Sequence, residues 1–184
     1  MALKENTGSV SRTYLTIREG KVARKDGETW KLYDSIEGTI DELSTRENKF
    51  GEQELCINMH DGLDNYQLQL KQNGSYFRAF ASMAQNITPG GRIEFIPVLK
   101  EENGRKNVGL ILKQNGKIVK WAHTKGNPNG MPEPEVITKK SGEKIYDWSE
   151  RDAFLVDKVN ELNARISSNV SLPVEEEQQD DLPF

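Results

Sequence analysis

Two short segments of alternating residues restrict the fold of this chain more than any other feature. Every second residue is apolar in residues 55–59 and again in residues 66–70, with the turn signal Asp61-Gly62 between them. A period of two places the apolar side chains on one face of a β-strand. Because only a short turn separates the two strands, we expect them to pair as an antiparallel hairpin. The chain therefore needs a sheet with one buried face.

Further strands are predicted on the N-terminal side of this hairpin. Residues 13–18 and 21–24 are β-forming segments joined by a turn, so they predict an additional N-terminal hairpin. The main strand series is expected to begin near Trp30. Its first long segment continues to Leu43 and is expected to bend or bulge at Gly38.

Strands are also predicted toward the C-terminus. Residues 92–99 and 105–113 read as a pair of strands around a polar turn, and residues 117–121 as a third strand. Asn115-Gly116 is a strong hairpin turn signal between the last two. These segments extend the predicted sheet.

One short helix interrupts the strands. Ser75 can cap a helix that we expect to run through Gln85, and Pro89-Gly90-Gly91 ends it. The apolar residues within it recur at helical spacing, which gives the helix one apolar stripe. They are Phe77, Phe80, Ala81 and Ala84.

The central elements therefore follow the order strand, strand, strand, short helix, strand, strand. This is the element order of the OB-fold, a small five-stranded Greek-key barrel. We predict a mainly β protein in which residues 1–122 form an OB-fold-like domain that includes the N-terminal hairpin. Another small β-barrel is the alternative.

The C-terminal third is predicted to contain a loop, a helix and an acidic tail rather than further strands. Residues 123–146 are rich in Gly, Pro, Asn and Lys and predict a loop. Residues 147–166 predict a helix, because Asp147-Trp148-Ser149-Glu150 resembles a capping box and an apolar stripe follows it. We expect the stripe to dock on the barrel, with dimerisation as the alternative. Residues 167–184 are predicted to be a disordered acidic tail.

Composition limits the compartment of the protein. Cys56 is the single cysteine, which excludes an intramolecular disulfide and a multi-cysteine zinc site. Residues 1–10 are polar and do not resemble a signal peptide, and no apolar stretch approaches the ~18–20 residues that a membrane span requires. We therefore expect a cytoplasmic protein that does not contact a membrane.

No pattern in the sequence indicates catalysis. The chain has neither a phosphate-binding Gly-x-x-x-x-Gly-Lys-Ser/Thr loop nor a Cys-x-x-Cys pair. His60, Asp61 and Asp64 have the chemistry of metal ligands, but an Asp-Gly hairpin turn explains the same residues. We predict that the protein is not an enzyme and needs neither a metal nor another cofactor.

Charge is divided unevenly along the chain. The net charge is −4, but residues 171–184 carry five acidic residues and no basic one, so the tail is −5 and the rest +1. The tail ends in Asp180-Asp181-Leu182-Pro183-Phe184. A terminal aromatic beside an α-carboxylate suits an apolar pocket rimmed by Lys or Arg on a partner protein.

This ending resembles the C-terminal tip of bacterial and phage single-stranded DNA-binding proteins, in which acidic residues precede Ile/Leu-Pro-Phe. In that family the tip recruits replication and repair proteins. The resemblance implies a protein that coats and protects single-stranded DNA without strong sequence preference during replication, recombination or repair. It implies the cytoplasm of a bacterium or of a phage-infected host, and it leaves self-association open. Over the body, the match is one of element order only.

Nucleic-acid-binding residues in the body follow from geometry. Single strands are held by cations that follow the phosphates and by aromatic faces on which bases stack. In an OB-fold, strands 2 and 3 and the loops 1–2 and 4–5 form this surface. Strand parity selects Tyr33 and Phe50 for stacking, with Trp30 and Trp121 as second choices. The other candidates are Lys31, Arg46, Lys49, Asn58, Gln67, Gln69, Lys71, Lys100, Arg105 and Lys106.

Other functions fit the same residues. A protein-interaction adaptor would use a β-barrel body with an acidic tether, and an RNA-binding OB-fold protein would use nearly the same chemistry. The acidic tail also resembles a phosphate backbone in charge. If it competes with DNA for a basic groove, deletion of residues 171–184 should tighten DNA binding, most clearly at low salt.

Overall fold

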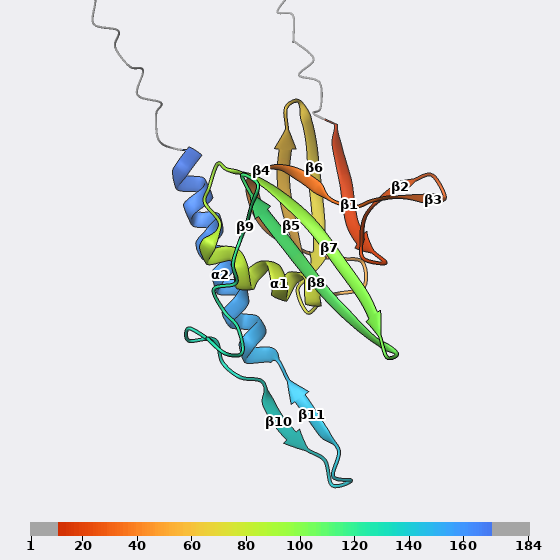
Figure 1. The fold of residues 1–184 in the computed structure, drawn as a ribbon, viewed down its shortest axis with the longest axis vertical. Coiled ribbons are helices and arrows are strands. Elements are labelled where there is room, and N and C mark those ends of the chain that lie inside the picture. The colour runs from red at the N-terminus through yellow and green to blue at the C-terminus, as the bar shows by residue number, and fades with distance from the viewer. Residues whose placement is uncertain (1–10, 171–184) are drawn as a thin grey trace, which may run out of the picture.

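The structure, a computed structural model, describes residues 11–170 (Figure 1). It is mainly β, with 49% strand and 21% helix, which confirms the predicted class. No helix in the described residues is long and apolar enough to cross a membrane. The elements are β1 Arg12–Arg18, β2 Lys21–Asp26, β3 Thr29–Tyr33, β4 Ile36–Glu47, β5 Gln53–Asp61, β6 Asp64–Lys71, α1 Ser75–Met83, β7 Arg92–Glu102, β8 Arg105–Gln114, β9 Lys117–Ile118, β10 Glu135–Thr138, β11 Lys144–Asp147 and α2 Ser149–Val170.

One nine-stranded sheet forms most of the molecule, in the order β3-β2-β1-β6-β5-β4-β7-β8-β9. The predicted order of three strands, one helix and two strands is present as β4, β5, β6, α1, β7 and β8. Within residues 11–170 the sheet does not close into a barrel. Instead, the N-terminal strand β1 pairs in parallel with β6 and occupies its edge.

The predicted central hairpin is present. β5 and β6 pair along their whole length, and opposite residues such as Ile57 and Leu68 are both buried. Gly62 at the turn has a φ of 59°, which a glycine adopts without strain. The alternation of apolar residues therefore forms one buried face, as predicted.

The long strand β4 is irregular, but not where the sequence suggests. The bulge falls between Ile40 and Glu42, so the prediction of a bulge at Gly38 was wrong. Gly38 has a different role, because a Cβ there would lie 2.6 Å from the carbonyl oxygen of His60. The extra residue, Asp41, lets Ile40 and Leu43 both face the core.

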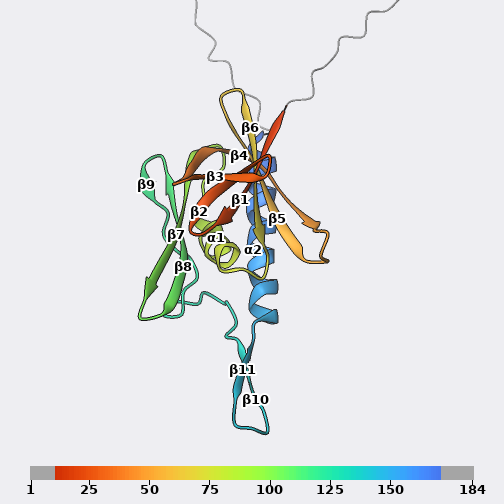
Figure 2. The ribbon, with the colours of Figure 1, turned by 90° about the vertical axis from the view of Figure 1, so that its right-hand side faces the viewer.

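The N-terminal extension contains three strands rather than the expected hairpin. β2 pairs with both β1 and β3, and Trp30 belongs to β3 rather than to the long strand that follows. The β1–β2 turn is anchored on β7, since a Cβ on Gly20 would lie 2.5 Å from the Cβ of Leu99. Figure 2 shows the extension in front of the helices, with β7 on one side and β5 on the other.

Both predicted helices pack on the core. α1 ends at Met83 and continues as one 3₁₀ turn over Ala84–Asn86, so the helical segment reaches the predicted length. Its N-cap is Gly74, without a side-chain cap from Ser75. α1 buries Phe77 and Phe80, and Phe80 stacks on Phe95.

Helix α2 docks against β4 and α1 with the predicted stripe. Full burial of each large apolar side chain of this stripe contributes about 1.5–3 kcal/mol. Asn163 Oδ1 accepts a hydrogen bond of 2.8 Å from the backbone N–H of Leu43 in β4, and the Arg165 guanidinium donates to Ala84 and Ile87 carbonyls. The helix continues to Val170, so residues 167–170 are helical rather than part of the predicted disordered tail. The buried stripe is Leu155, Val159, Leu162 and Ile166.

Residues 123–146, predicted to be a loop, contain a two-stranded arm. β10 and β11 pair in antiparallel register, with Val136 opposite Tyr146 and Ile137 opposite Ile145. The arm projects beyond the first turn of α2 (Figures 1 and 2). The Gly and Pro residues of this segment lie mainly in the loops around the arm. Its two strands have four residues each, which is too short for a clear alternation of apolar and polar residues, so the sequence predicted a loop.

Candidate nucleic-acid interface

The strand register defines a continuous polar and aromatic surface on the side of the sheet opposite Leu15 and Leu68. On it, Asn58 lies beside Gln67, and Gln67 beside Tyr14, across β5, β6 and β1. We call this surface the outer face. It continues over β2 and β3. Its members on β1, β2 and β3 are Tyr14, Thr16, Arg18, Lys21, Lys25, Trp30, Leu32 and the fully buried Ala23.

Three large side chains are exposed on the outer face. Tyr14 is 58% exposed, Leu32 48% and Trp30 38%. The guanidinium of Arg18 lies 4.4 Å from the centroid of the Trp30 ring. This cation–π contact holds a guanidinium against the indole ring.

Cations surround these side chains. Within residues 11–170, Arg12, Arg18 and Lys25 make no ion pair, whereas Lys21 pairs with Asp34. Unpaired exposed cations are available to bind an anionic ligand, because no carboxylate of the protein has to be displaced. The outer face therefore combines stacking surface and free positive charge.

The predicted amides lie on the outer face and bind one another. The Asn58 amide donates to Glu42 at 3.1 Å, the Gln67 amide donates to Asn58 at 2.8 Å, and the Gln69 amide donates to Gln67 at 3.0 Å. Asn58 and Gln67 are only 6% and 8% exposed. This chain of side chains spans three strands, so it stiffens the face more than it offers free donors.

Cys56 lies in the same face, opposite Gln69 in the register of β5 and β6. Burial raises the pKa of its thiol, while the nearby guanidinium groups of Arg46 and Arg12 act in the opposite direction. Arg46 is paired with Glu54 at 3.1 Å, whereas Arg12 makes no ion pair with described residues.

Two predicted residues on β3 lie on the other side of the strand. Lys31 and Tyr33 share the face of Arg24 and Val22. Lys31 pairs with Asp26 at 2.6 Å, and this hydrogen bond raises the pKa of Lys31 and lowers that of Asp26. Tyr33 lines a cavity of about 300 Å³ whose wall includes Tyr66, Arg24 and the acidic residues Glu37 and Asp61, which both pair with Arg92.

The predicted aromatic in the β4–β5 loop is fully accessible. Phe50 is 74% exposed, and Lys49 Nζ lies 5.0 Å from its ring centroid. The neighbouring cation Lys71 pairs with Glu52 at 2.7 Å, and that contact lowers the pKa of Glu52. This loop therefore offers an aromatic with one free cation.

The predicted cations of the β7–β8 hairpin form a separate group. Lys100, Arg105 and Lys106 are exposed and make no ion pair with any residue that the structure describes. Glu101 and Glu102 lie opposite Lys106 and Arg105 in the register and dilute the positive charge. Figure 2 shows this hairpin tip and the β4–β5 loop on opposite sides of the molecule, so they do not form one patch.

Sequence reasoning missed Tyr14, Arg12, Arg18 and Lys25. The signal was present in the first strand, where buried Leu15 and half-buried Ile17 alternate with exposed Tyr14 and Arg18. The predicted partner-binding residues 180–184 lie outside the described part of the chain.

The histidines do not gather metal ligands. His60 Nδ1 lies 2.7 Å from Asp41 Oδ1, and His123 Nδ1 lies 3.0 Å from the Pro128 carbonyl oxygen. No group of three or more His, Cys, Asp or Glu side chains in residues 11–170 is arranged to hold a metal ion. Comparisons with protein-family models, curated proteins and solved structures gave no match.

Proposed function

We propose that this protein binds single-stranded DNA across its outer face. It would coat and protect DNA without strong sequence preference during replication, recombination or repair. The observation that carries the proposal is the placement of exposed Tyr14 and Trp30 on one face with the unpaired cations Arg12, Arg18 and Lys25. Aromatic faces and cations in one groove or surface are the means by which proteins hold single strands.

The chemistry favours a single strand over a duplex. Bases of a single strand can leave their stack and lie on Tyr14 and Trp30, whereas duplex bases are already stacked. Lys25 is directly opposite Trp30 in the register, so a base on the indole would bring its phosphate within reach of a cation. Stacking of this kind tolerates any base, which supports sequence-independent binding.

The fold supports the proposal through its element order. The central strands follow the order of an OB-fold, and β5 and β6 correspond to the two strands whose face binds nucleic acid in that fold. We infer an opened OB-like sheet in which β1 extends the binding face by pairing with β6. The acidic tip, by its resemblance to the single-stranded DNA-binding family, would recruit replication or repair proteins.

The test is a binding titration with the full-length protein. A fluorescent ~30-nucleotide oligo-dT and a duplex of the same length are compared across a salt series. We expect submicromolar, salt-sensitive preference for the single strand, and a matching titration with oligo-U measures any RNA preference. Trp30→Ala should weaken binding, and Trp121→Ala serves as a control with similar exposure outside the face. Absence of binding at low salt would disprove the proposal.

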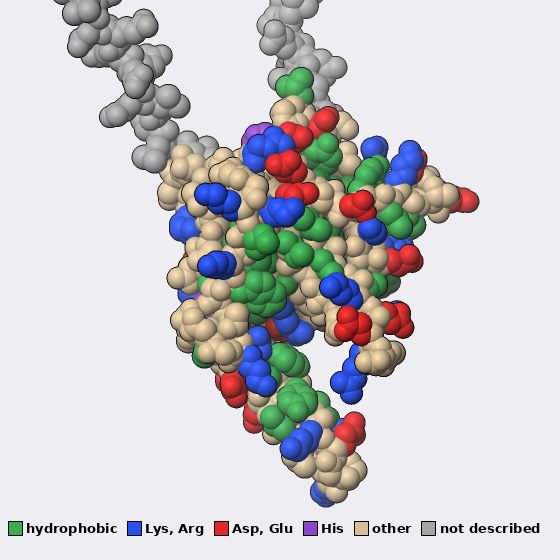
Figure 3. Space-filling view, in the orientation of Figure 1, with side chains coloured by type: hydrophobic (Ala, Val, Ile, Leu, Met, Phe, Trp, Pro, Cys, Tyr) green, Lys and Arg blue, Asp and Glu red, His purple; other side chains and the backbone are tan. Residues whose placement is uncertain are grey.

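A second candidate function, a protein-interaction adaptor, rests on a different surface. Ile96 on β7 lies opposite Ile111 on β8, and Ile118 on β9 lies opposite Lys113 on β8. Ile111 and Ile118 are exposed, and Figure 3 shows apolar side chains gathered over these strands. Exposed apolar patches often bind other proteins. Ile111→Ser should leave DNA binding unchanged and would abolish binding of a protein that docks there.

A further inference from the structure

A cavity of about 370 Å³ lies where the β10–β11 arm meets the start of α2, far from the outer face. Val136 and Tyr146, which are opposite each other in the arm, contribute one wall. Trp148 continues this wall, with its ring tilted against that of Tyr146 at 6.5 Å. Met131, Pro132 and Pro134 complete a mainly apolar lining.

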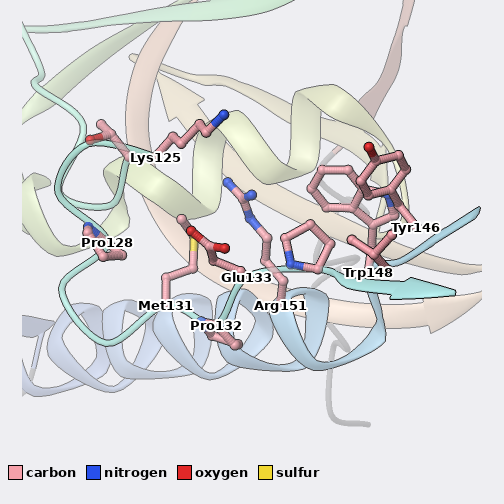
Figure 4. Close-up of a pocket in the computed structure, with 11 residues that line it drawn as sticks. Lys125, Pro128, Met131, Pro132, Glu133, Tyr146, Trp148 and Arg151 are labelled. Atoms are coloured by element: carbon pink, nitrogen blue, oxygen red, sulfur yellow. The ribbon is translucent and has the colours of Figure 1, made fainter. Parts of the chain in front are cut away.

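Cations lie at the rim of this cavity. Figure 4 shows Arg151 rising between Glu133 on one side and Trp148 on the other, with Lys125 opposite. Arg151 makes a cation–π contact with Trp148 at 5.2 Å but no ion pair with described residues, and its buried Nε has no hydrogen-bond partner. Arg78 also contacts the Trp148 ring, but it is neutralised by two hydrogen bonds of 2.7 Å to Asp152.

The site therefore joins an apolar, aromatic lining to two unpaired cations, Lys125 and Arg151. This chemistry is complementary to residues 180–184 of the chain itself, in which Leu182-Pro183-Phe184 are apolar and Asp180 and Asp181 are anions. We propose that the cavity binds the C-terminal tip of a second copy of this chain. The inference goes beyond DNA binding and does not depend on it.

Distance favours a second copy over the same chain. The cavity lies beside the first turn of α2, and the tail begins after its last residue. A helix of 22 residues is ~33 Å long. The residues from 171 to 181 can span at most ~36–40 Å, so the tip of the same chain would reach the cavity only with an almost straight tail. The tip of another copy has no such restriction.

The direct test uses a fluorescent peptide of residues 175–184 and the full-length protein carrying Phe184→Ala, so that its own tip does not compete. We expect saturable binding with a Kd below about 100 μM. Val136→Ser should weaken it at least fivefold, while Ile137→Ser, with similar exposure on the opposite face of β10, should not. Arg151→Gln should weaken binding, because the positive charge of Arg151 attracts the acidic tip. Glu133→Gln should strengthen binding, because the negative charge of Glu133 repels the tip.

Two outcomes would overturn the inference. One is that the peptide does not bind at 500 μM, roughly five times the expected limit for the Kd. The other is that binding is lost with Lys25→Gln on the outer face and kept with Val136→Ser, which would place the tip in the DNA-binding surface.

Sedimentation gives an independent measurement. The average mass of the unmodified protein should rise with concentration, and Phe184→Ala and Val136→Ser should each abolish the rise.

Discussion

The two faces of the N-terminal extension differ in charge although they belong to the same three strands. The outer face places Trp30 beside Arg18, and Lys25 beside Trp30. The opposite face places Tyr33 in a cavity whose wall includes Arg24 and the acids Glu37 and Asp61. Both acids pair with Arg92, and Lys31 pairs with Asp26. A shift of one residue along β3 therefore changes an aromatic beside two unpaired cations into an aromatic whose neighbouring charges, apart from Arg24, are held in ion pairs. The comparison shows that exposure of an aromatic is insufficient evidence for a DNA contact, because the neighbouring charges decide whether phosphate is attracted.

The strongest test of this comparison removes the aromatics from one face at a time. Tyr14→Ala and Trp30→Ala should each weaken oligo-dT binding by roughly 5- to 160-fold, because each stacked base contributes about 1–3 kcal/mol. Tyr33→Ala should change binding less than twofold. Fluorescence anisotropy at a fixed salt concentration measures the affinity of all three variants. A larger loss of affinity with Tyr33→Ala than with the other two would show that DNA binds the opposite face. Phe50→Ala tests the β4–β5 loop in the same assay.

A second prediction concerns the β1–β2 turn, which packs against Leu99 in β7. Gly20→Ala should lower the free energy of unfolding by about 2–4 kcal/mol, because the new Cβ meets Leu99 and the φ of 73° is strained for alanine. Gly27→Ala is the matched control, since its φ is also positive but nothing lies within 4 Å of the new Cβ. It should cost only about 1 kcal/mol. Equal denaturant midpoints for the two variants would show that the turn does not rest on β7.

A third prediction separates the cations of the two faces. A plot of the logarithm of the DNA-binding constant against the logarithm of the salt concentration has a negative slope. Arg18→Gln and Lys25→Gln should each make this slope less steep by about 0.7, the value for one phosphate contact with a single strand. Lys31→Gln should leave the slope unchanged, because Lys31 is paired with Asp26 on the opposite face. Titrations at four salt concentrations measure the slopes. A reduced slope for Lys31→Gln alone would contradict the assignment.

The smallest expected effect is at Cys56 in the outer face. Burial raises the pKa of this thiol, so it should react with a thiol reagent at pH 8 more slowly than a free cysteine, and more slowly again when oligo-dT is bound. Because the pKa is higher in the folded state, the stabilisation is present below the unfolded thiol pKa and is lost as the pH rises through the folded pKa. Cys56→Ala should remove this alkaline loss. A reaction rate equal to that of the unfolded chain would show that the thiol is accessible.

Sequence periodicity was sufficient for the parts of the fold that depend on local pattern. The β5–β6 hairpin, the short helix after Ser75 and the apolar stripe of α2 were predicted because each repeats apolar residues at the period of one element. Phe77 and Phe80, which belong to the predicted apolar stripe of the short helix, are fully buried. The short arm strands carry too few residues for such a signal.

The candidate site was predictable only in part. Parity placed Asn58, Gln67 and Gln69 on one face, where the structure brings them together. It also placed Tyr33 and Lys31 outward, but on β3 both faces are exposed and the deciding factor is the register with β2. A one-residue difference in register exchanges the two faces of a strand. Whether these residues contact DNA stays a prediction.

By itself, the sequence determined the β-rich class, the order of the central elements and the acidic, apolar tip. These depend on residue type and spacing, which are local properties. Only the tertiary structure decided that β1 pairs in parallel with β6, that the β1–β2 turn rests on Leu99, and that Trp30 rather than Tyr33 contacts the guanidinium of Arg18. Those features depend on which sheet edge is available when the chain folds, and many local patterns are compatible with each choice.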